Sequence, residues 1–491
     1  MKGVVSKKME RLLDLITCFE VHGRELDIHA AAEALDCPAT TLLMDILQAN
    51  TTFSTIFQIE RDNKIRLVYK NGNSYPDVFS LVMKQDPICS LLEKVFFHSD
   101  LDVAAMTNDL YVSPSTIYRW VEQFNSAVSG SYAVHLETHP LVLTGDEAEV
   151  RSFYTSFFKE RYSLYEWPFP AVSKKELSRF LNETLPMEYG KKFLHYYKCF
   201  HIQLAVTLQR FSQGFRLPDE NLMQNTRAQQ MAKAIIAKGI RSSFSFFPVE
   251  KKDDDVRFCQ ELLVPYVSDR DAESFEVLLN LTARDPLANN LFLYINKLIA
   301  YLCQEFPVEL DNESALILAL YNALMGTFGK TVSRSFLYSP YRIYQESIRV
   351  KFPSVCNQIL RIIRTQNELF DLSVDPDFLG YVFYVIWSTW ENLSNQLVQK
   401  PRKIKILVIS KFSSFHALSL RSQILFYFGS IAEVSIPKDS PIFLDAIDLS
   451  RYDLLVSNFK IADSPIPTVF CNSIDSYAAY SALSKAISAR L

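Results

Sequence analysis

The sequence predicts a mainly helical, multidomain protein of 491 residues that ends in a small α/β domain. The composition is 48% hydrophobic with only 12 glycines, which is typical of well-packed helices. Two segments within the first 150 residues each join short helices to an alternating, hairpin-like stretch, and strand-like and helical segments alternate after residue 400. A chain of this length is expected to hold about three to five domains.

The stretch VSPSTIYRWVEQFN, residues 112–125, predicts a short amphipathic helix. Ser113 suits the N-cap and Pro114 the first helical position, and the apolar residues Ile117, Trp120, Val121 and Phe124 fall on one face. The opposite face carries groups that suit phosphates or base edges, and its candidate DNA-binding residues are Ser115, Thr116, Tyr118, Arg119 and Gln123. An ordinary surface helix would show the same periodicity, so the neighbouring segments must show whether this helix belongs to a DNA-binding unit.

Those neighbours favour a winged helix-turn-helix over residues 73–150. LDVAAMTNDL (101–110) predicts a preceding short helix, and YVSPS predicts the tight turn between the two helices. YAVHLETHPLVLTGDE (132–147) then reads as two alternating strands around a Thr-His-Pro turn, as expected of a wing. The helix at 112–125 is therefore predicted to be a recognition helix.

A similar order occurs upstream, over residues 1–72. Helical stretches and the turn DCPAT lead to the helix TLLMDILQAN and to the hairpin FQIERDNKIRLVYK. The outward residues expected on this helix suit DNA less well, and they are Thr40, Thr41, Met44, Asp45 and Gln48. Lys64 and Arg66 in the hairpin, with Lys70, are candidates for phosphate contact. Acidic residues outnumber basic ones across residues 1–150, which argues against tight, charge-driven binding.

Residues 150–400 read as a long run of helical patterns, followed by a change of pattern. We predict two all-helical domains, 151–280 and 281–400, although nothing in the composition marks the boundary near 280. From 401 to 491 strands and helices alternate, which predicts a small parallel sheet covered by helices.

Several classes of protein are disfavoured by the sequence. The eight cysteines are scattered without metal-ligand spacing, so we expect reduced thiols, no metal and no cofactor. The first twenty residues lack a signal-peptide core, and the longest apolar stretches are shorter than the ~20 residues that span a bilayer. We expect a cytoplasmic protein without membrane contact.

The segment HLETHPLVLTGDEAEVRSFYTSFFKERY resembles the Mga/AtxA group of bacterial transcriptional regulators, and the order of parts is similar as well. That group joins two helix-turn-helix domains to two phosphotransferase-system regulation domains (PRDs) and a domain shaped like enzyme IIB. The resemblance implies two PRD-like domains, an enzyme IIB-like carboxy-terminal domain, binding to duplex promoter DNA, a homodimer and control by a phosphocarrier protein.

HIQLAVTLQR, residues 201–210, resembles the PRD pattern in which a histidine opens a helix and an arginine follows. His201 is therefore the candidate phosphorylation site, with His195 and Arg210 nearby; a buried, hydrogen-bonded histidine would give the same pattern. No histidine lies between His201 and His416, so the second PRD-like domain offers no acceptor, and Tyr381 stands near the expected position. We expect that domain to serve packing and dimerisation.

The loop after the first strand of the α/β domain reads ILVISKFSSFHALSL. In enzyme IIB proteins a cysteine and a glycine-containing loop stand here, whereas this chain has Ser410 and no glycine before Gly429. We therefore expect no phosphocarrier activity, and His416 reads as a surface histidine or, less readily, as an anion ligand.

The leading hypothesis is a non-enzymatic, dimeric DNA-binding regulator. One alternative is a component of the phosphotransferase system, which the missing cysteine and glycine disfavour. The other is an RNA-binding antiterminator, because PRDs also occur in such proteins; these begin with a strand-rich RNA-binding domain, whereas this chain begins with helix-turn-helix units.

Overall fold

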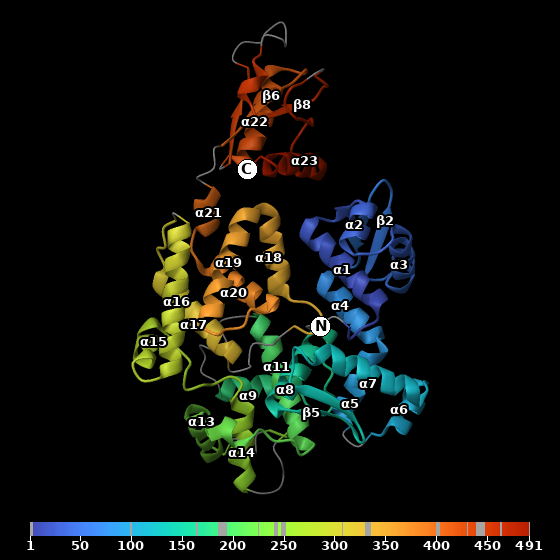
Figure 1. Cartoon of the computed structure of the whole chain (residues 1–491), viewed down its shortest axis with the longest axis vertical. Helices are drawn as coiled ribbons and strands as arrows, with labels where there is room; N and C mark the ends of the chain where they lie inside the picture. Colours follow the sequence, from blue (N-terminus) through green and yellow to red (C-terminus); the bar gives the residue numbers. More distant parts are fainter. Residues whose placement is uncertain are drawn as a thin grey trace. The chain divides into compact units, whose positions relative to one another are not determined.

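The computed structural model describes residues 3–98, 101–163, 165–184, 194–223, 225–239, 244–246, 252–306, 308–328, 335–398, 403–429, 431–437, 447–461 and 464–490 (Figure 1). The chain divides into two compact units. The first comprises Met1–Ile299 and Ser314–Ile386, and the second comprises Ala300–Glu313 and Trp387–Leu491. The predicted boundary at 400/401 lies outside the described residues, and the other predicted domain boundaries stay predictions.

The amino-terminal segment contains helices followed by a β-hairpin, in the order that the sequence predicts. Its elements are α1 (Lys7–His22), β1 (Glu25–Leu26), α2 (Ile28–Ala34), α3 (Ala39–Thr52), β2 (Phe57–Arg61) and β3 (Ile65–Tyr69). The strands form an antiparallel sheet in the order β1-β3-β2. Asn50 fixes the last turns of α3 to the wing, because its side chain accepts from the backbone N–H of Ile59 at 2.7 Å and donates to the Ile59 carbonyl at 2.8 Å.

The same design recurs in the next segment. Its elements are α4 (Tyr75–Gln85), α5 (Pro87–Phe97), α6 (Val103–Leu110), α7 (Pro114–Val128), β4 (Val134–Thr138) and β5 (Leu141–Gly145). Asn125 in α7 repeats the role of Asn50, because it accepts from Leu136 N–H at 2.8 Å and donates to the Leu136 carbonyl at 3.0 Å. The two segments thus share an asparagine that bonds to the backbone of the following hairpin.

Helices follow without a strand through the described residues up to 398, as predicted. They are α8 (Glu147–Arg161), α9 (Lys174–Thr184), α11 (Leu194–Ser212), α12 (Asp219–Met223), α13 (Thr226–Ala237), α14 (Lys252–Leu263), α15 (Phe275–Thr282), α16 (Pro286–Glu305), α17 (Glu313–Phe328), α18 (Pro340–Lys351), α19 (Pro353–Leu369), α20 (Pro376–Thr389) and α21 (Leu393–Val398).

Helix α8 lies at the centre of the first unit. It packs against α4, β5 and α11, and it is buried on nearly all sides (Figure 1). Its aromatic side chains join the core of the second winged helix to that of the helices behind it, and the fully buried ones are Phe153, Tyr154, Phe157 and Phe158. The charged residues that α8 also buries, among them Glu147, Arg151 and Glu160, have hydrogen-bond or ion-pair partners, as buried charges require.

A short segment before α18 returns to the amino-terminal half of the first unit. Phe336 is fully buried in the core around α8, and the Tyr338 ring packs on Phe79 of α4 at a centroid distance of 4.4 Å. The buried carboxylate of Glu160, in α8, accepts hydrogen bonds from the backbone N–H groups of Phe336 and Leu337, at 2.5 and 2.7 Å. Residues 336–338, which we call the return segment, thereby tie chain positions some 176 residues apart.

The carboxy-terminal domain is an α/β unit with a four-stranded parallel sheet, as predicted. Its elements are β6 (Ile404–Ile409), α22 (Ser414–Phe428), β7 (Ala432–Ser435), the 3-10 helix η3 (Leu449–Arg451), β8 (Leu454–Ser457), β9 (Thr468–Phe470) and α23 (Tyr477–Ser488). The sheet order is β7-β6-β8-β9. Between β7 and β8 the described residues contain only η3, and residues 438–446 lie outside the described part of the chain.

Candidate nucleic-acid interface

The predicted recognition helix is α7, and its amino-terminal cap forms as expected. Ser113 caps the helix, because its Oγ accepts a hydrogen bond from the Thr116 backbone N–H at 3.3 Å, and Pro114 is the first helical residue. The apolar face is buried as predicted at Ile117, Val121 and Phe124, while Trp120 is half-buried. This face fixes the helix on the core and leaves the other face to solvent.

The candidate contact residues on the outer face differ in how available they are. Ser115, Tyr118 and Arg119 are exposed. Thr116 is half-buried, and its hydroxyl forms a hydrogen bond of 2.9 Å with the hydroxyl of Ser113. The side chain of Gln123 donates to the Gly3 carbonyl at 2.7 Å, so it already serves a contact within the chain.

The wing stands next to this exposed face. The hairpin of β4 and β5 turns at His139, whose ring lies roughly parallel to that of Tyr118, with centroids 6.3 Å apart. The Thr138 hydroxyl shares a hydrogen bond of 3.0 Å with the His139 ring. Tyr118 of α7 and His139 of the wing therefore lie next to each other on this face.

The charge of this segment is strongly negative. Residues 73–150 contain three Lys or Arg residues against eleven Asp or Glu residues. Two of the cations are paired, Lys84 with Glu166 at 2.6 Å and Lys94 with Asp109. Arg119 makes no hydrogen bond or ion pair with any residue that the structure describes. The electrostatic term of nucleic-acid binding would therefore depend heavily on this one guanidinium.

The first winged helix presents a different surface. Met44 and Leu47 on α3 are exposed, at 65% and 61% of their full areas. Asp45 was expected to face outward, and this expectation was wrong: Asp45 is buried and pairs with Arg11 of α1 at 2.8 Å. The periodicity places it outward on an isolated helix, but α1 covers that side.

The two candidate cations in the first wing lie near its tip. Lys64 is exposed directly after the Asp62-Asn63 turn. Arg66 is about half exposed and pairs with Glu25 of β1 at 3.3 Å. Both side chains can reach solvent, and Arg66 must exchange a carboxylate partner for any phosphate.

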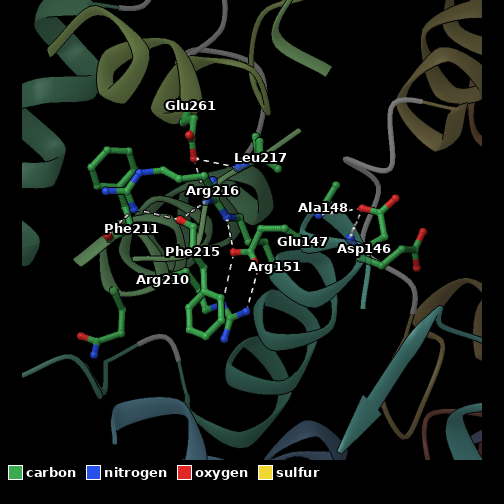
Figure 2. Close-up of polar contacts among 12 residues, drawn as sticks. Asp146, Glu147, Ala148, Arg151, Arg210, Phe211, Phe215, Arg216, Leu217 and Glu261 are labelled. Carbon is green, nitrogen blue, oxygen red and sulfur yellow. Dashed lines mark hydrogen bonds and ion pairs between the residues drawn. The ribbon is translucent and has the colours of Figure 1, made fainter. Parts of the chain in front are cut away.

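Each of the last three residues of the LTGDE motif, at the end of the second wing, has a different structural role. Gly145 has a φ of +135°, and a Cβ there would lie 2.2 Å from the Ala133 carbonyl oxygen, so the position needs glycine. Asp146 caps α8, because its Oδ1 accepts from the Ala148 N–H at 2.8 Å (Figure 2). Glu147 then points inward to two arginines.

Those arginines form a buried network with two carboxylates (Figure 2). Glu147 accepts from Arg151 Nε at 2.8 Å and from Arg210 Nη2 at 2.6 Å, and Arg151 Nη2 donates to Glu261 at 2.7 Å. All four side chains are less than 10% exposed, and the Arg210 guanidinium also lies 3.5 Å from the centroid of the Phe215 ring. Arg257 also reaches Glu261, at 3.3 Å from a more exposed position, and the network joins the start of α8 to α11 and α14.

Helix α11 carries both Arg210 and the candidate phosphorylation site. His201 is 1% exposed, and its Nε2 lies 2.8 Å from the Ser178 hydroxyl of α9. Phosphoryl transfer to His201 would therefore require α9 to move away from α11. His195 lies on the same helix, but its side chain is outside the described residues.

The corresponding helix of the later region, α20, contains the tyrosine expected near the missing histidine. Tyr381 is buried, and its ring packs on that of Tyr341 of α18 at 4.7 Å. A Cβ at Gly380 would lie 3.3 Å from Gln345 Oε1 and 3.4 Å from Arg342 backbone atoms, so α20 and α18 pack closely at this point. The position expected for a histidine is thus taken by a tyrosine that packs in the interior.

In the α/β domain, the residues singled out from the sequence lie side by side. Ser410 Oγ is 2.8 Å from His416 Nδ1, and His416 Nε2 is 2.9 Å from the carbonyl oxygen of Asn472. His416 is half-buried and bonded on both sides. The pairing of Ser410 with His416 was not predicted, although both residues were noted.

Within the described ranges, no group of three His, Cys, Asp or Glu side chains is placed to hold a metal ion. No helix in the described part of the chain is both long enough and apolar enough to cross a membrane.

Known proteins are similar to this chain over the segment that holds the candidate interface. The sequence profile of the Mga helix-turn-helix domain matches residues 71–158, the segment that holds α7 and the second wing. A protein of Streptococcus pneumoniae serotype 4, named as a trans-acting regulator, is 22% identical over 468 residues, which cover 94% of this chain and 93% of that protein.

Two regulators from Bacillus anthracis match parts of the chain. The capsule synthesis positive regulator AcpB is 21% identical over 43% of each chain. The capsule synthesis positive regulator AcpA is 21% identical over 36% of this chain and 37% of its own.

Proposed function

Because the chain is a transcriptional regulator of the Mga/AtxA-like family, we propose that it binds duplex promoter DNA through the second winged helix. The observation that carries this proposal is the outer face of α7. There Ser115, Tyr118 and Arg119, which has no ion-pair partner among the described residues, are exposed beside the wing, within the segment that matches the Mga helix-turn-helix domain. Ser115 and Arg119 can donate to phosphates, and Tyr118 can reach a base edge or a sugar.

The first winged helix is proposed as an accessory contact. Lys64 and Arg66 near its wing tip would add to the electrostatic term, while the exposed Met44 and Leu47 make α3 a poor reader of base edges. Because cations are few, we expect modest affinity that falls with salt, and a preference that depends partly on DNA shape.

We further propose that the helical region between α8 and α20 consists of two PRD-like domains, and that it senses the state of the phosphotransferase system through a phosphocarrier protein. His201 is the proposed acceptor. The ion pair between Arg210 and Glu147 supports a route for the signal, because it links the helix that carries His201 to the residue that follows the wing. A phosphoryl group adds about −1.5 to −2 charges, enough to separate α11 from α9.

We also propose a homodimer formed through the carboxy-terminal domain, which would be enzyme IIB-like in shape. Helices α22 and α23 expose aromatic side chains, with Phe426 at 82%, Tyr427 at 45% and Tyr477 at 74%, and Tyr480 of α23 packs on Tyr427 with a ring-centroid distance of 5.4 Å. Large aromatic side chains are enriched at the centres of protein interfaces.

The dimer is tested by analytical ultracentrifugation of the full chain, of the chain truncated after residue 400, and of Phe426→Glu. Truncation and substitution should both lower the dimer content and the DNA affinity. As the matched control, Phe470→Glu changes an exposed aromatic residue of β9, outside both helices. A truncated protein that stays fully dimeric at low concentration would place the interface elsewhere.

DNA binding itself is tested by fluorescence anisotropy with labelled promoter duplexes and with RNA hairpins of matched length and charge. Tighter binding to duplex DNA supports the proposal. Preference for the hairpins would favour an antiterminator. No preference, together with unchanged DNA binding in Arg119→Ala, would remove α7 from the interface.

A further inference from the structure

Tyr111 lies in the turn between α6 and α7 in a backbone conformation that suits a tyrosine poorly (Figure 1). Its φ of +55° is in the left-handed region, and its side chain is 93% exposed. Five described residues other than glycine have a positive φ, and the other four are aspartate or asparagine, the types that tolerate this region best. Tyr111 is thus the only aromatic residue that the described chain holds in this region, and the backbone gives no reason for a tyrosine here.

The first winged helix has the same turn with a different residue. Asp36, with a φ of +48°, precedes the N-cap of α3 by two positions, as Tyr111 precedes the N-cap of α7. In each turn the backbone N–H of the next residue donates to a carbonyl five positions earlier, at 3.0 Å in the first copy and 3.2 Å in the second. The same backbone geometry therefore forms with a residue that suits it in one copy and with an unfavourable one in the other.

The backbone of Tyr111 is held in place, although its side chain contacts nothing inside the protein. Leu110 before it and Val112 after it pack against the core of the second winged helix. The Tyr111 side chain makes no hydrogen bond or ring contact with any residue that the structure describes. Backbone strain of this kind persists where the surrounding structure fixes it, and it is concentrated at sites of function. A fixed, exposed aromatic group is preorganised to contact an external partner.

The position of this turn indicates the chemistry of the partner. In helix-turn-helix proteins the first helix crosses the DNA backbone, and the amino-terminal residues of the second helix enter the major groove. A residue in the turn between the two helices therefore faces sugars and phosphates at the edge of the groove. Because residues 73–150 hold three cations against eleven carboxylates, a neutral contact with the DNA backbone would add affinity that positive charge does not supply.

We propose that Tyr111 contacts the DNA backbone. Its hydroxyl donates a hydrogen bond to a phosphate oxygen, and its ring packs on the adjoining deoxyribose. This contact rests on the proposed DNA-binding function, and it lies outside the face of α7 that carries that function. It differs from the contact expected of Arg119 in one measurable way. A neutral phenol releases no counterion from the DNA, so Tyr111 adds affinity without adding to the salt dependence.

The test measures folding and DNA binding on the same variants of the full-length protein. Tyr111→Asn supplies a residue that suits the left-handed region, so it should raise the melting temperature by about 1–3 °C. It should also weaken binding about tenfold, with an unchanged salt slope, to a labelled duplex that the wild-type protein selects from random sequences. A residue with only a structural role would not raise stability and lower affinity in one substitution.

Two further variants and a modified duplex separate the parts of the contact. Tyr111→Phe keeps the ring and the backbone conformation, and should lose about threefold in affinity with the hydroxyl. Tyr165→Asn changes a tyrosine that is 94% exposed outside the second winged helix, and should bind like the wild type. Methylphosphonate linkages, introduced one at a time, locate the phosphate. The linkage that replaces it should weaken binding of the wild type and leave binding of Tyr111→Phe unchanged.

Three results would overturn the proposal. One is wild-type affinity in Tyr111→Asn, and another is a lower salt slope in that variant, which would indicate an effect of charge. The third is a methylphosphonate scan in which the wild type and Tyr111→Phe respond alike at every position. If the wild-type protein shows no preference for duplex DNA over RNA hairpins, the proposed function itself fails. If it shows that preference and Tyr111→Asn binds equally well, only the Tyr111 contact fails.

Discussion

Arg210 and Glu147 form a buried, two-bond ion pair, with Nη2–Oε2 and Nε–Oε1 distances of 2.6 and 3.2 Å. One partner lies on α11, nine residues after the candidate phosphorylation site, and the other is the second residue after the wing's last glycine. The wing and α11 therefore cannot move independently without separating two charges in a region from which water is excluded.

The first prediction concerns this pair. Glu147→Gln leaves the guanidinium groups of Arg151 and Arg210 buried with too little negative charge, so it should reduce the free energy of unfolding by about 3–5 kcal/mol. Urea unfolding followed by circular dichroism measures the loss. Arg349→Met breaks an exposed pair with Glu346 and should cost about 1 kcal/mol or less. Equal effects of the two substitutions would show that the network contributes little.

The second prediction uses two glycines of the same segment. Gly145→Ala should destabilise the second winged helix by about 1–3 kcal/mol or more, because the added Cβ meets the Ala133 carbonyl oxygen in a backbone conformation that suits glycine. Gly130→Ala, where a Cβ meets nothing within 4 Å, should be nearly neutral. Thermal melting of both variants gives the comparison, and a destabilised Gly130→Ala would point to a general intolerance of this region.

The third prediction isolates Arg119. If its guanidinium contacts a phosphate, Arg119→Ala should weaken DNA binding and lower the slope of log affinity against log salt by about one unit. Lys84→Ala is the matched control, because that cation is already paired with Glu166. Anisotropy titrations across a salt series give both slopes. Unchanged affinity and slope for Arg119→Ala would exclude this residue.

The fourth prediction concerns His201. Phosphorylated carrier protein should label His201 slowly, because the ring is buried and bonded to Ser178. Ser178→Ala removes that bond and should speed labelling, while His201→Ala should abolish it. In promoter assays His201→Asp and His201→Ala should differ, because only the former supplies a negative charge. Labelling of His195 in place of His201 would contradict the assignment.

The fifth prediction is a pH dependence at Glu160. Burial raises the pKa of Glu160 above its ordinary value of 4.5, against the opposing effects of Lys159 and of the N–H groups of Leu337 and Phe336. At a pH between 4.5 and the raised value, the Glu160 carboxyl therefore keeps its proton in the folded protein but has lost it in the unfolded chain. This contribution to stability is fully present below pH 4.5 and is lost as the pH rises through the raised value.

The melting temperature of the wild-type protein minus that of Glu160→Gln should therefore fall between acidic and neutral pH. Glu122→Gln, at an exposed position of α7, controls for general effects of acid. If this difference in melting temperature grew with pH, the predicted direction of the Glu160 pKa shift would be wrong.

Local signals in the sequence predicted local structure well. The cap at Ser113, the buried face of α7 and both hairpins follow from residue type and periodicity within a few positions. The two asparagines that fix the wings also carried a signal, because Asn50 and Asn125 each end a Gln-x-Asn sequence, and comparing the two repeats would have found them. Asp45, which was wrongly expected to be exposed, shows where local signals fail, because contact with another helix, α1, buries it.

Contacts between distant positions could not be predicted in this way. Glu147, Arg151 and Glu261 are ordinary charged residues in their own helices, and only the fold brings them together. The pairing of Ser410 with His416 depends on a carbonyl 56 positions away from the histidine, which no spacing rule contains.

The return segment, residues 336–338, is held by Glu160 through main-chain N–H groups. Almost any amino acid supplies that donor, so a survey of correlated substitutions would find no trace of this attachment, although it joins two halves of the first unit. Proline is the exception, because it lacks the N–H. A chimera that takes its later helices from a relative should therefore still seat on this amino-terminal half, provided that it keeps the glutamate and a proline-free stretch of the same length.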